Sequence, residues 1–301
     1  MKMKKVMAVA LSMACAATML SATAVTASAA DKKEVVIWDY FETDAQKEMI
    51  QSLMDGFNAS QDEYEATHVY VPFSDYEKQL TLGIASGELP DLVILDGCSM
   101  ASFIQLGLFG DISDADINWD EYIEGPLEST MMDGKHYGIP FATNCTALYY
   151  NKDMFEKAGI TEVPTSLEGI LAIGDDLKTK GGAGEPLALS IYGWYFEQWL
   201  CKQGLSYADN GNGRDAAATA VEFDSNGGAL NILNEWKALN DADVAPNVGR
   251  AGSDTATTDF TSGKAAITLG STASLKQILQ DVNGSFEVGT AYFPTIKDGD
   301  E

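Results

Sequence analysis

Residues 34–95 alternate between extended and helical patterns, and this alternation strongly limits the folds open to the chain. EVVIW (34–38), THVYV (67–71) and DLVIL (91–95) have the β-branched, apolar composition of buried strands. Thr43 and Gln46 form a capping box before the first helical stretch, and the second helical stretch covers residues 75–86. The order strand, helix, strand, helix, strand predicts a parallel α/β unit, whose ligands normally bind beyond the carboxyl ends of the strands. Those ends carry residues 39–43, 72–76 and 96–99.

A second informative stretch is DGKHYGIPFATNCTALYYNKDMFEKAG, residues 133–159. It begins with a turn at Asp133-Gly134 and continues as an apolar run through residues 139–141. A polar kink follows at 143–146, then a second extended run at 147–150 and a short helix that Gly159 ends. Two extended runs interrupted by polar residues suggest a hinge, where the chain passes between lobes and groups at the kink face a cleft.

The remainder of the chain predicts a second α/β half. Strands are expected at 187–192, 265–269 and 286–293, and a Gly/Asn turn at 209–214. Helices are expected at 194–204 and at 228–240, the latter with Leu230, Leu233 and Trp236 on its apolar face. A chain of 301 residues can bury one large core or two smaller ones of about 130 residues each.

The N-terminus has the pattern of a secretory signal peptide. Lys2, Lys4 and Lys5 form a basic region before an apolar stretch at 6–20 that is short and rich in Ala and Ser. The Ala-x-Ala pattern at 27–29 predicts cleavage near Ala29-Ala30. Residues 12–14 before Cys15 make a poor lipidation signal, so we expect a product without a lipid anchor.

The charge balance and the cysteines exclude several classes of protein. The chain has 19 Lys+Arg and 45 Asp+Glu, and without the three lysines of the leader the balance is 16 − 45 = −29. Such a surface repels nucleic acid and anionic membranes, so we expect neither as a partner. Cys98, Cys145 and Cys201 are an odd, widely spaced set, which predicts free and mostly buried thiols rather than disulfides or a zinc site.

Catalytic motifs are absent from the sequence. It contains no Gly-x-Ser-x-Gly, no His-Glu-x-x-His and no phosphate-binding Gly-rich loop, and neither His68 nor His136 belongs to a recognisable catalytic or metal-binding set. Asp114, Asp116 and Asn118 have the spacing of a calcium loop, but tryptophan stands where glycine is required, so we expect a solvated acidic loop. We therefore predict no catalytic residue, no cofactor and no metal. Two carboxylates suffice for glycoside hydrolysis, and that alternative stays open.

The hinge stretch, together with YEKQLTLGIASGELPDLVIL and FTSGKAAITLGS in this order, resembles the bacterial extracellular solute-binding proteins of family 1, of the maltose-binding and glycerol-3-phosphate-binding type. The resemblance implies an α/β, periplasmic-binding-protein-like fold with two lobes (type II). It divides the chain into a signal peptide (1–30), lobe 1 (31–140), lobe 2 (141–290) with a hinge strand around 139–150, and the start of a return crossing (291–301). Family members continue beyond this point, so the resemblance also implies a chain truncated at its C-terminus.

The resemblance also suggests ligand-binding residues. Tyr76 matches a ligand-contacting tyrosine, Asn144 stands at the hinge position, Ser271 matches a ligand-contacting serine, and Trp194 aligns near a stacking aromatic residue. Phe41 and Asp96 join this set because they follow predicted strands, where aromatic rings and carboxylates suit a carbohydrate. Each also has a structural interpretation: packing for the aromatic residues, capping for Asp96 and Ser271, and backbone satisfaction for Asn144.

Some positions depart from the family pattern. Asp96-Gly97 stands where the phosphate-binding branch has glutamate, and Thr272-Ala273 where many sugar binders have tryptophan. No arginine stands at an aligned site, although Arg250 is nearby in the sequence.

Together, these features predict a monomeric, extracytoplasmic receptor that binds a sugar or oligosaccharide and delivers it to the membrane subunits of an ABC importer. Glycerol 3-phosphate or another sugar phosphate is the alternative ligand. A secreted glycan-acting hydrolase and a surface sensor or adhesin are the alternatives of another class.

Overall fold

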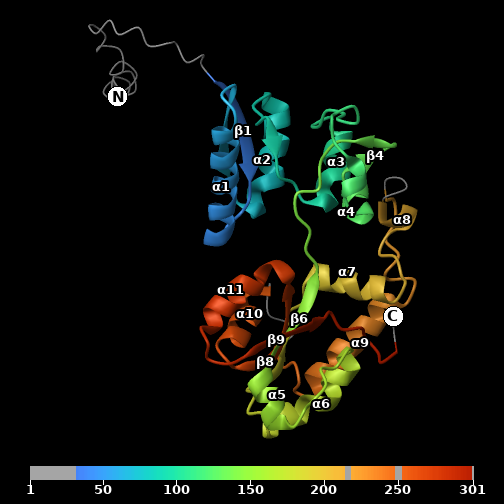
Figure 1. Ribbon diagram of the computed structural model, residues 1–301. Helices are drawn as coiled ribbons and strands as arrows, with labels where there is room; N and C mark the ends of the chain where they lie inside the picture. The colour runs from blue at the N-terminus through green and yellow to red at the C-terminus, as the bar shows by residue number, and fades with distance from the viewer. Residues whose placement is uncertain (1–31, 214–217, 248–252, 300–301) are drawn as a thin grey trace, which may run out of the picture. The chain divides into compact units, whose positions relative to one another are not determined.

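The computed structural model describes residues 32–213, 218–247 and 253–299, in two compact units (Figure 1). Unit 1 ends at Leu108 and unit 2 begins at Phe109. The predicted signal peptide and Arg250 lie outside the described residues. The lobe boundary near residue 140 is a different division of the chain, and it stays a prediction.

Unit 1 is built on a parallel sheet with the strand order β2-β1-β3. The predicted alternation of strands and helices is confirmed, although the third strand is only two residues long. The capping box is also confirmed: Thr43 Oγ1 accepts from Gln46 N at 3.3 Å, and Thr43 N donates to Gln46 Oε1 at 3.1 Å. The elements are β1 (Lys33–Asp39), α1 (Asp44–Ser60), β2 (Tyr64–Tyr70), α2 (Phe73–Ser86), β3 (Leu92–Val93), η1 (Gly97–Ser99) and α3 (Met100–Gln105).

Unit 2 begins with short elements around a hairpin. The turn predicted at Asp133-Gly134 is confirmed, with both residues at positive φ (52° and 73°) between β4 and β5. The elements are η2 (Trp119–Glu121), α4 (Glu124–Glu128), β4 (Met131–Met132) and β5 (Lys135–His136).

The rest of unit 2 contains its main sheet and most of its helices. The predicted Gly/Asn turn is present in α8, where Asn210, Gly211 and Asn212 all have left-handed backbone angles. The elements are β6 (Thr146–Asn151), α5 (Lys152–Ala158), α6 (Leu167–Thr179), β7 (Glu185–Ala188), α7 (Gly193–Lys202), α8 (Asp209–Gly213), α9 (Gly228–Asp241), α10 (Ser253–Thr261), β8 (Ala265–Ser271), η3 (Thr272–Ser274), α11 (Leu275–Val282) and β9 (Val288–Tyr292).

The main sheet of unit 2 has the order β7-β8-β6-β9 and is covered by helices on both faces (Figure 1). Successive side chains of β6 point to opposite faces, as the pleat requires. Leu148 joins the larger apolar core with α5, α6, α7 and α9. Ala147 and Tyr149 join a smaller core with α10 and α11. The arrangement is therefore helix, sheet, helix, and β6 is one of the two inner strands of the sheet.

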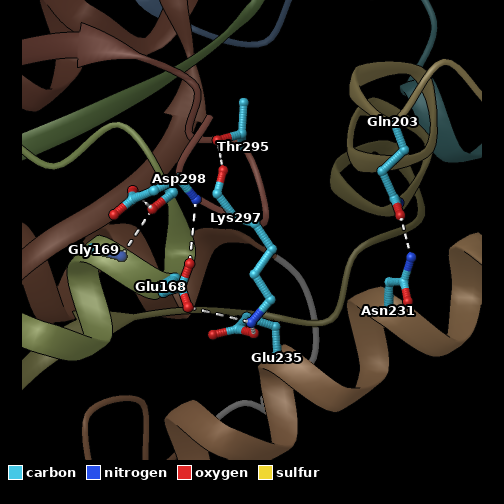
Figure 2. A network of polar contacts seen from close by, with 9 residues as sticks. Glu168, Gly169, Gln203, Asn231, Glu235, Thr295, Lys297 and Asp298 are labelled. Atoms are coloured by element: carbon cyan, nitrogen blue, oxygen red, sulfur yellow. Dashed lines mark hydrogen bonds and ion pairs between the residues drawn. The ribbon is translucent and has the colours of Figure 1, made fainter. Parts of the chain in front are cut away.

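The buried stripe of α9 differs from the predicted one. Trp236 is buried as expected, but Leu230 and Leu233 are exposed, and Ile232 and Glu235 are buried in their place. The predicted apolar face of α9 was wrong because one of the positions that point into the core, Glu235, carries a carboxylate, which a pattern of apolar residues does not include. Lys297 Nζ lies 2.6 Å from Glu235 Oε2 and satisfies it (Figure 2).

The segment after β9 is part of unit 2. Phe293 and Ile296 are buried in the larger core, and Trp199 Nε1 donates to Pro294 O at 3.0 Å. Leu167 N donates to Thr295 O at 2.9 Å. That this segment also begins a return crossing stays a prediction.

The three cysteines within the described residues are exposed. Cys98, Cys145 and Cys201 form no disulfide, so the expectation of mostly buried thiols was wrong. Each lies at an element end or in a connection, where the local pattern of apolar residues says little about burial.

Among the described helices, none combines the length and apolar character that a membrane crossing requires.

Candidate functional site

The carboxyl edge of the unit 1 sheet carries an aromatic cluster. Tyr40 follows β1, and its ring lies 5.7 Å from that of Phe41, 5.1 Å from that of Phe73 and 5.2 Å from that of Tyr76, each edge to face. These residues come from the end of β1 and the start of α2, which the parallel topology brings to one edge. The structure thus brings Phe41 and Tyr76 together, with Tyr40 between them.

Tyr76 and Phe41 form the inner part of this cluster. The Tyr76 side chain is only 2% exposed, and its hydroxyl donates to Trp38 O at 2.8 Å. Burial raises the pKa of the Tyr76 phenol, so it stays a neutral donor. Phe41 is also buried, whereas Phe73 is exposed. Tyr76 and Phe41 therefore act as packing residues in this structure, and their contact with a ligand stays a prediction.

Asp96 is an exposed carboxylate at the same edge. It precedes η1 with extended backbone angles, and its side chain makes no capping hydrogen bond. Burial and the negative charge of Asp96 raise the pKa of Tyr40 to about 12, which places the carboxylate beside the aromatic cluster. The Cys98 thiol also bonds to the Asp96 carboxylate. An exposed carboxylate next to an aromatic ring suits a ligand with both hydroxyl groups and apolar C–H faces.

A contact between the buried Asp39 carboxylate and the partly buried His68 ring supports the backbone of this edge, and sequence reasoning missed it. Asp39 Oδ2 lies 2.7 Å from His68 Nδ1, and Asp39 Oδ1 accepts from Phe41 N at 3.0 Å. Asp39 is fully buried, so these bonds fix the course of the chain through Tyr40 and Phe41. The register of β1 against β2 would have indicated this contact. Ile37 pairs with His68, and this pairing puts His68 close to Asp39 at the end of β1.

The corresponding edge of unit 2 collects the other three predicted residues. Strands β7 and β8 are parallel and end there, whereas β6 is antiparallel to β8 and begins there. Trp194 follows β7, Ser271 ends β8, and Asn144 precedes β6. We call this the ligand edge of unit 2. Two hydrogen bonds join the start of β6 to the end of β8. Thr272 N donates to Cys145 O at 2.9 Å, and Cys145 N donates to the side-chain Oγ1 of Thr272 at 3.2 Å.

The three side chains at this edge differ in how far they are engaged. Asn144 is exposed, and within the described residues its amide has no hydrogen-bond partner. Ser271 Oγ accepts from Ala273 N at 3.1 Å and so caps η3. Trp194 is half-buried in the first turn of α7 and packs against the larger core. Asn144 is therefore available to a ligand, Ser271 retains its O–H, and Trp194 shows part of its ring.

Tyr292 lies at the same edge and was missed from the sequence. It ends β9 directly opposite Ala147 of β6, and its side chain is 93% exposed. The alternation within residues 286–293 would have placed Tyr292 and Thr290 on one face, but it does not tell which helix covers that face.

Metal binding finds no support in the described part of the chain, where no group of three or more acidic, histidine or cysteine side chains is placed to hold an ion. In the acidic loop, bonds from Ser113 and Lys135 hold the pKa of the Asp111 carboxyl well below its usual range. Asp111 is thus committed within its own loop.

Comparison with known proteins identifies relatives. A family model described as bacterial extracellular solute-binding protein matches residues 52–300. The chain is 34% identical over 140 residues to a putative binding protein of Brucella abortus, which covers 43% of this chain and 33% of the relative. It is 29% identical over 270 residues to the sn-glycerol-3-phosphate-binding periplasmic protein UgpB of Yersinia pseudotuberculosis, which covers 85% of this chain and 60% of UgpB. The chain thus spans a third to about 60% of these relatives' lengths.

Solved structures show the same fold. The GacH receptor of Streptomyces glaucescens GLA.O, solved unliganded and with acarbose, matches with a TM-score of 0.76 at 23% identity, over 89% of this chain and 68% of that one. The cyclic alpha-maltosyl-1,6-maltose binding protein of Arthrobacter globiformis matches with a TM-score of 0.70 at 25% identity, over 89% and 67%. The sugar-binding protein MalE of Xanthomonas citri matches with a TM-score of 0.70 at 19% identity, over 87% and 66%. The predicted type II, two-lobed periplasmic-binding-protein-like fold is confirmed.

Proposed function

Because the chain belongs to the family of bacterial extracellular solute-binding proteins, we propose that it is the receptor of an ABC importer and binds a sugar or oligosaccharide. The membrane subunits of the importer are then its partners, and its place is outside the cytoplasmic membrane. It acts as a monomer that releases its solute unchanged, without catalysis.

The observation that carries the proposal is the ligand edge of unit 2. Asn144 and Ser271 are 127 residues apart in the sequence (271 − 144 = 127), and Trp194 lies between them. The strand order nevertheless brings all three to one edge of the sheet. They offer an amide, a partly exposed aromatic ring and a hydroxyl, the groups that a sugar ring needs. The edge of unit 1 adds the Asp96 carboxylate and the aromatic cluster around Tyr40.

The mechanism we propose is a shift between an open and a closed state. A solute that the closed state binds better shifts the population toward that state, which the importer recognises. We place the hinge in the segment around 139–150, which includes Asn144 and leads into β6.

A sugar phosphate is the less favoured ligand. UgpB is named for binding glycerol 3-phosphate, but this chain has 45 Asp+Glu against 19 Lys+Arg, and no arginine stands at a position that aligns with a ligand site, so a phosphate lacks its usual partner. The hydrolase alternative predicts that a bound oligosaccharide is cleaved. The adhesin alternative predicts binding to polymer rather than to a free solute.

A thermal-shift screen of the mature full chain against sugars, sugar phosphates and polyols tests the proposal. A solute present at 100 times its Kd should stabilise the folded protein by about 2.7 kcal/mol. A larger shift with a sugar phosphate than with any neutral sugar would replace the proposed ligand class. No shift with any solute, in a protein that circular dichroism shows to be folded, would overturn the receptor proposal.

A further inference from the structure

A hollow lies beside the ligand edge of unit 2, on the sheet face that α11 covers only in part. It has a volume of about 330 Å³, and its lining comes from β6, β9, η3 and the first residue of α11. We call it the β9 groove. Its volume lies within the range of about 300–1,000 Å³ that is usual for small-molecule sites.

The strand register explains why the groove exists. Ala147 pairs with Tyr292, and Tyr149 pairs with Thr290, so the four side chains share one face of the sheet. Ala147 and Tyr149 form part of the apolar core under α10 and α11, but Tyr292 is 93% exposed. The small Ala147 side chain gives the tyrosine ring no large partner across the strands, and the ring stands at the side of an open hollow.

The groove is continuous with the ligand edge. Thr272 lines it, and the same residue is joined through backbone and hydroxyl bonds to Cys145, the neighbour of Asn144. Tyr149 also lines it and donates from its hydroxyl to Ser271 O at 2.7 Å. A ligand held by Asn144 and Ser271 therefore needs only a short extension to enter the groove.

The lining has the chemistry of a site for a neutral sugar ring. Tyr292 presents an exposed aromatic face, Leu275 presents an apolar one, and Thr272 and Thr290 bring hydroxyl groups. Its lining residues include no aspartate, glutamate, lysine or arginine. A sugar stacks its C–H face on such a ring and keeps its hydroxyls bonded at the sides, whereas a phosphate finds no cation to pair with.

We propose that the β9 groove is an outer subsite, in which Tyr292 stacks on a second or third ring of an oligosaccharide whose first ring is bound at Asn144 and Ser271. This inference rests on the proposed function and narrows it, because it makes the solute a neutral oligosaccharide rather than a monosaccharide.

Isothermal titration calorimetry on the mature full chain tests the subsite with three pairs of probes: glucose and maltotriose, xylose and xylotriose, and N-acetylglucosamine and chitotriose. One trisaccharide should bind about tenfold tighter than its monosaccharide, which corresponds to roughly 1.4 kcal/mol. Tyr292→Ala should remove that advantage and leave the Kd of the monosaccharide within about twofold. Tyr292→Phe keeps the ring and should bind as the wild type does.

Leu230→Ala is the matched control, because Leu230 is exposed on α9 of the same unit and does not line the groove. Equal affinity of Tyr292→Ala and wild type for the trisaccharide would overturn the subsite, and so would an equal loss for both sugars of a pair. A loss in Tyr292→Phe as large as in Tyr292→Ala would overturn the stacking. In these three cases the receptor proposal stands. If none of the six sugars binds to the folded wild type, the sugar-receptor proposal itself fails, and the subsite fails with it.

Discussion

Trp194→Ala separates ligand binding from packing at the ligand edge of unit 2. The structure provides an internal comparison, because Trp194 and Trp199 lie in the same helix, α7. Trp199 is fully buried and donates to Pro294 O, whereas Trp194 is half-buried at the first turn. Replacing a buried tryptophan by alanine costs about 3–5 kcal/mol. We therefore expect Trp199→Ala to lose at least about 4 kcal/mol, since a hydrogen bond is lost as well.

The Trp194→Ala substitution removes less buried surface, because Trp194 is only partly buried, so we expect it to cost less than Trp199→Ala, about 2–3 kcal/mol. Its affinity for the sugar should fall more than tenfold, about 1.4 kcal/mol or more, because the exposed part of the ring is the part that a sugar can stack on. Urea unfolding followed by circular dichroism gives the stability, and calorimetry gives the Kd. A stability loss equal to that of Trp199→Ala, or an unchanged Kd, would refute the assignment of Trp194 to the site.

The remaining predictions concern stability. Lys297→Met should destabilise unit 2 by about 2 kcal/mol, because it leaves the buried Glu235 carboxylate unpaired, and adding Glu235→Gln should recover about half of that loss in urea unfolding. Failure of the double variant to recover would mean that the network in Figure 2 acts through packing rather than charge. Burial raises the pKa of the Glu197 carboxyl. Between the ordinary glutamate pKa and this raised pKa, the folded state therefore binds more protons than the unfolded chain. The contribution of Glu197 to the free energy of unfolding falls as the pH rises through that window. Glu197→Gln should accordingly raise the melting temperature at pH 7 and leave it unchanged near pH 3. Equal gains at both pH values would exclude the carboxylate as the cause.

The sequence predicted the fold where local chemistry and tertiary structure agree. The strand and helix order of residues 34–95, the Thr43–Gln46 capping box and the turn at Asp133-Gly134 each have a local physical cause, and the structure contains all of them. The meeting of Trp194 and Ser271 at one edge could also be expected, because parallel strands end on the same side.

Features that depend on distant partners could not be predicted in this way. Glu235 is buried because Lys297, 62 residues further along the chain, reaches it, so a stripe of apolar residues gave the wrong face for α9. The sequence predicted a strand over residues 286–293, but the exposure of Tyr292 depends on which parts of the fold cover its face of the sheet, and no local pattern shows that. The burial of Tyr76 depends on Tyr40 and on the carbonyl of Trp38, and neither contact has a local signal.

The most direct test of the account is calorimetric titration of the mature full chain with the sugar that gives the largest thermal shift, followed by recovery of that sugar for mass spectrometry. We predict that the protein binds one equivalent of a neutral sugar or oligosaccharide, which is recovered with its glycosidic bonds intact. Cleavage of the sugar, or the absence of binding by any sugar to the folded protein, would contradict it.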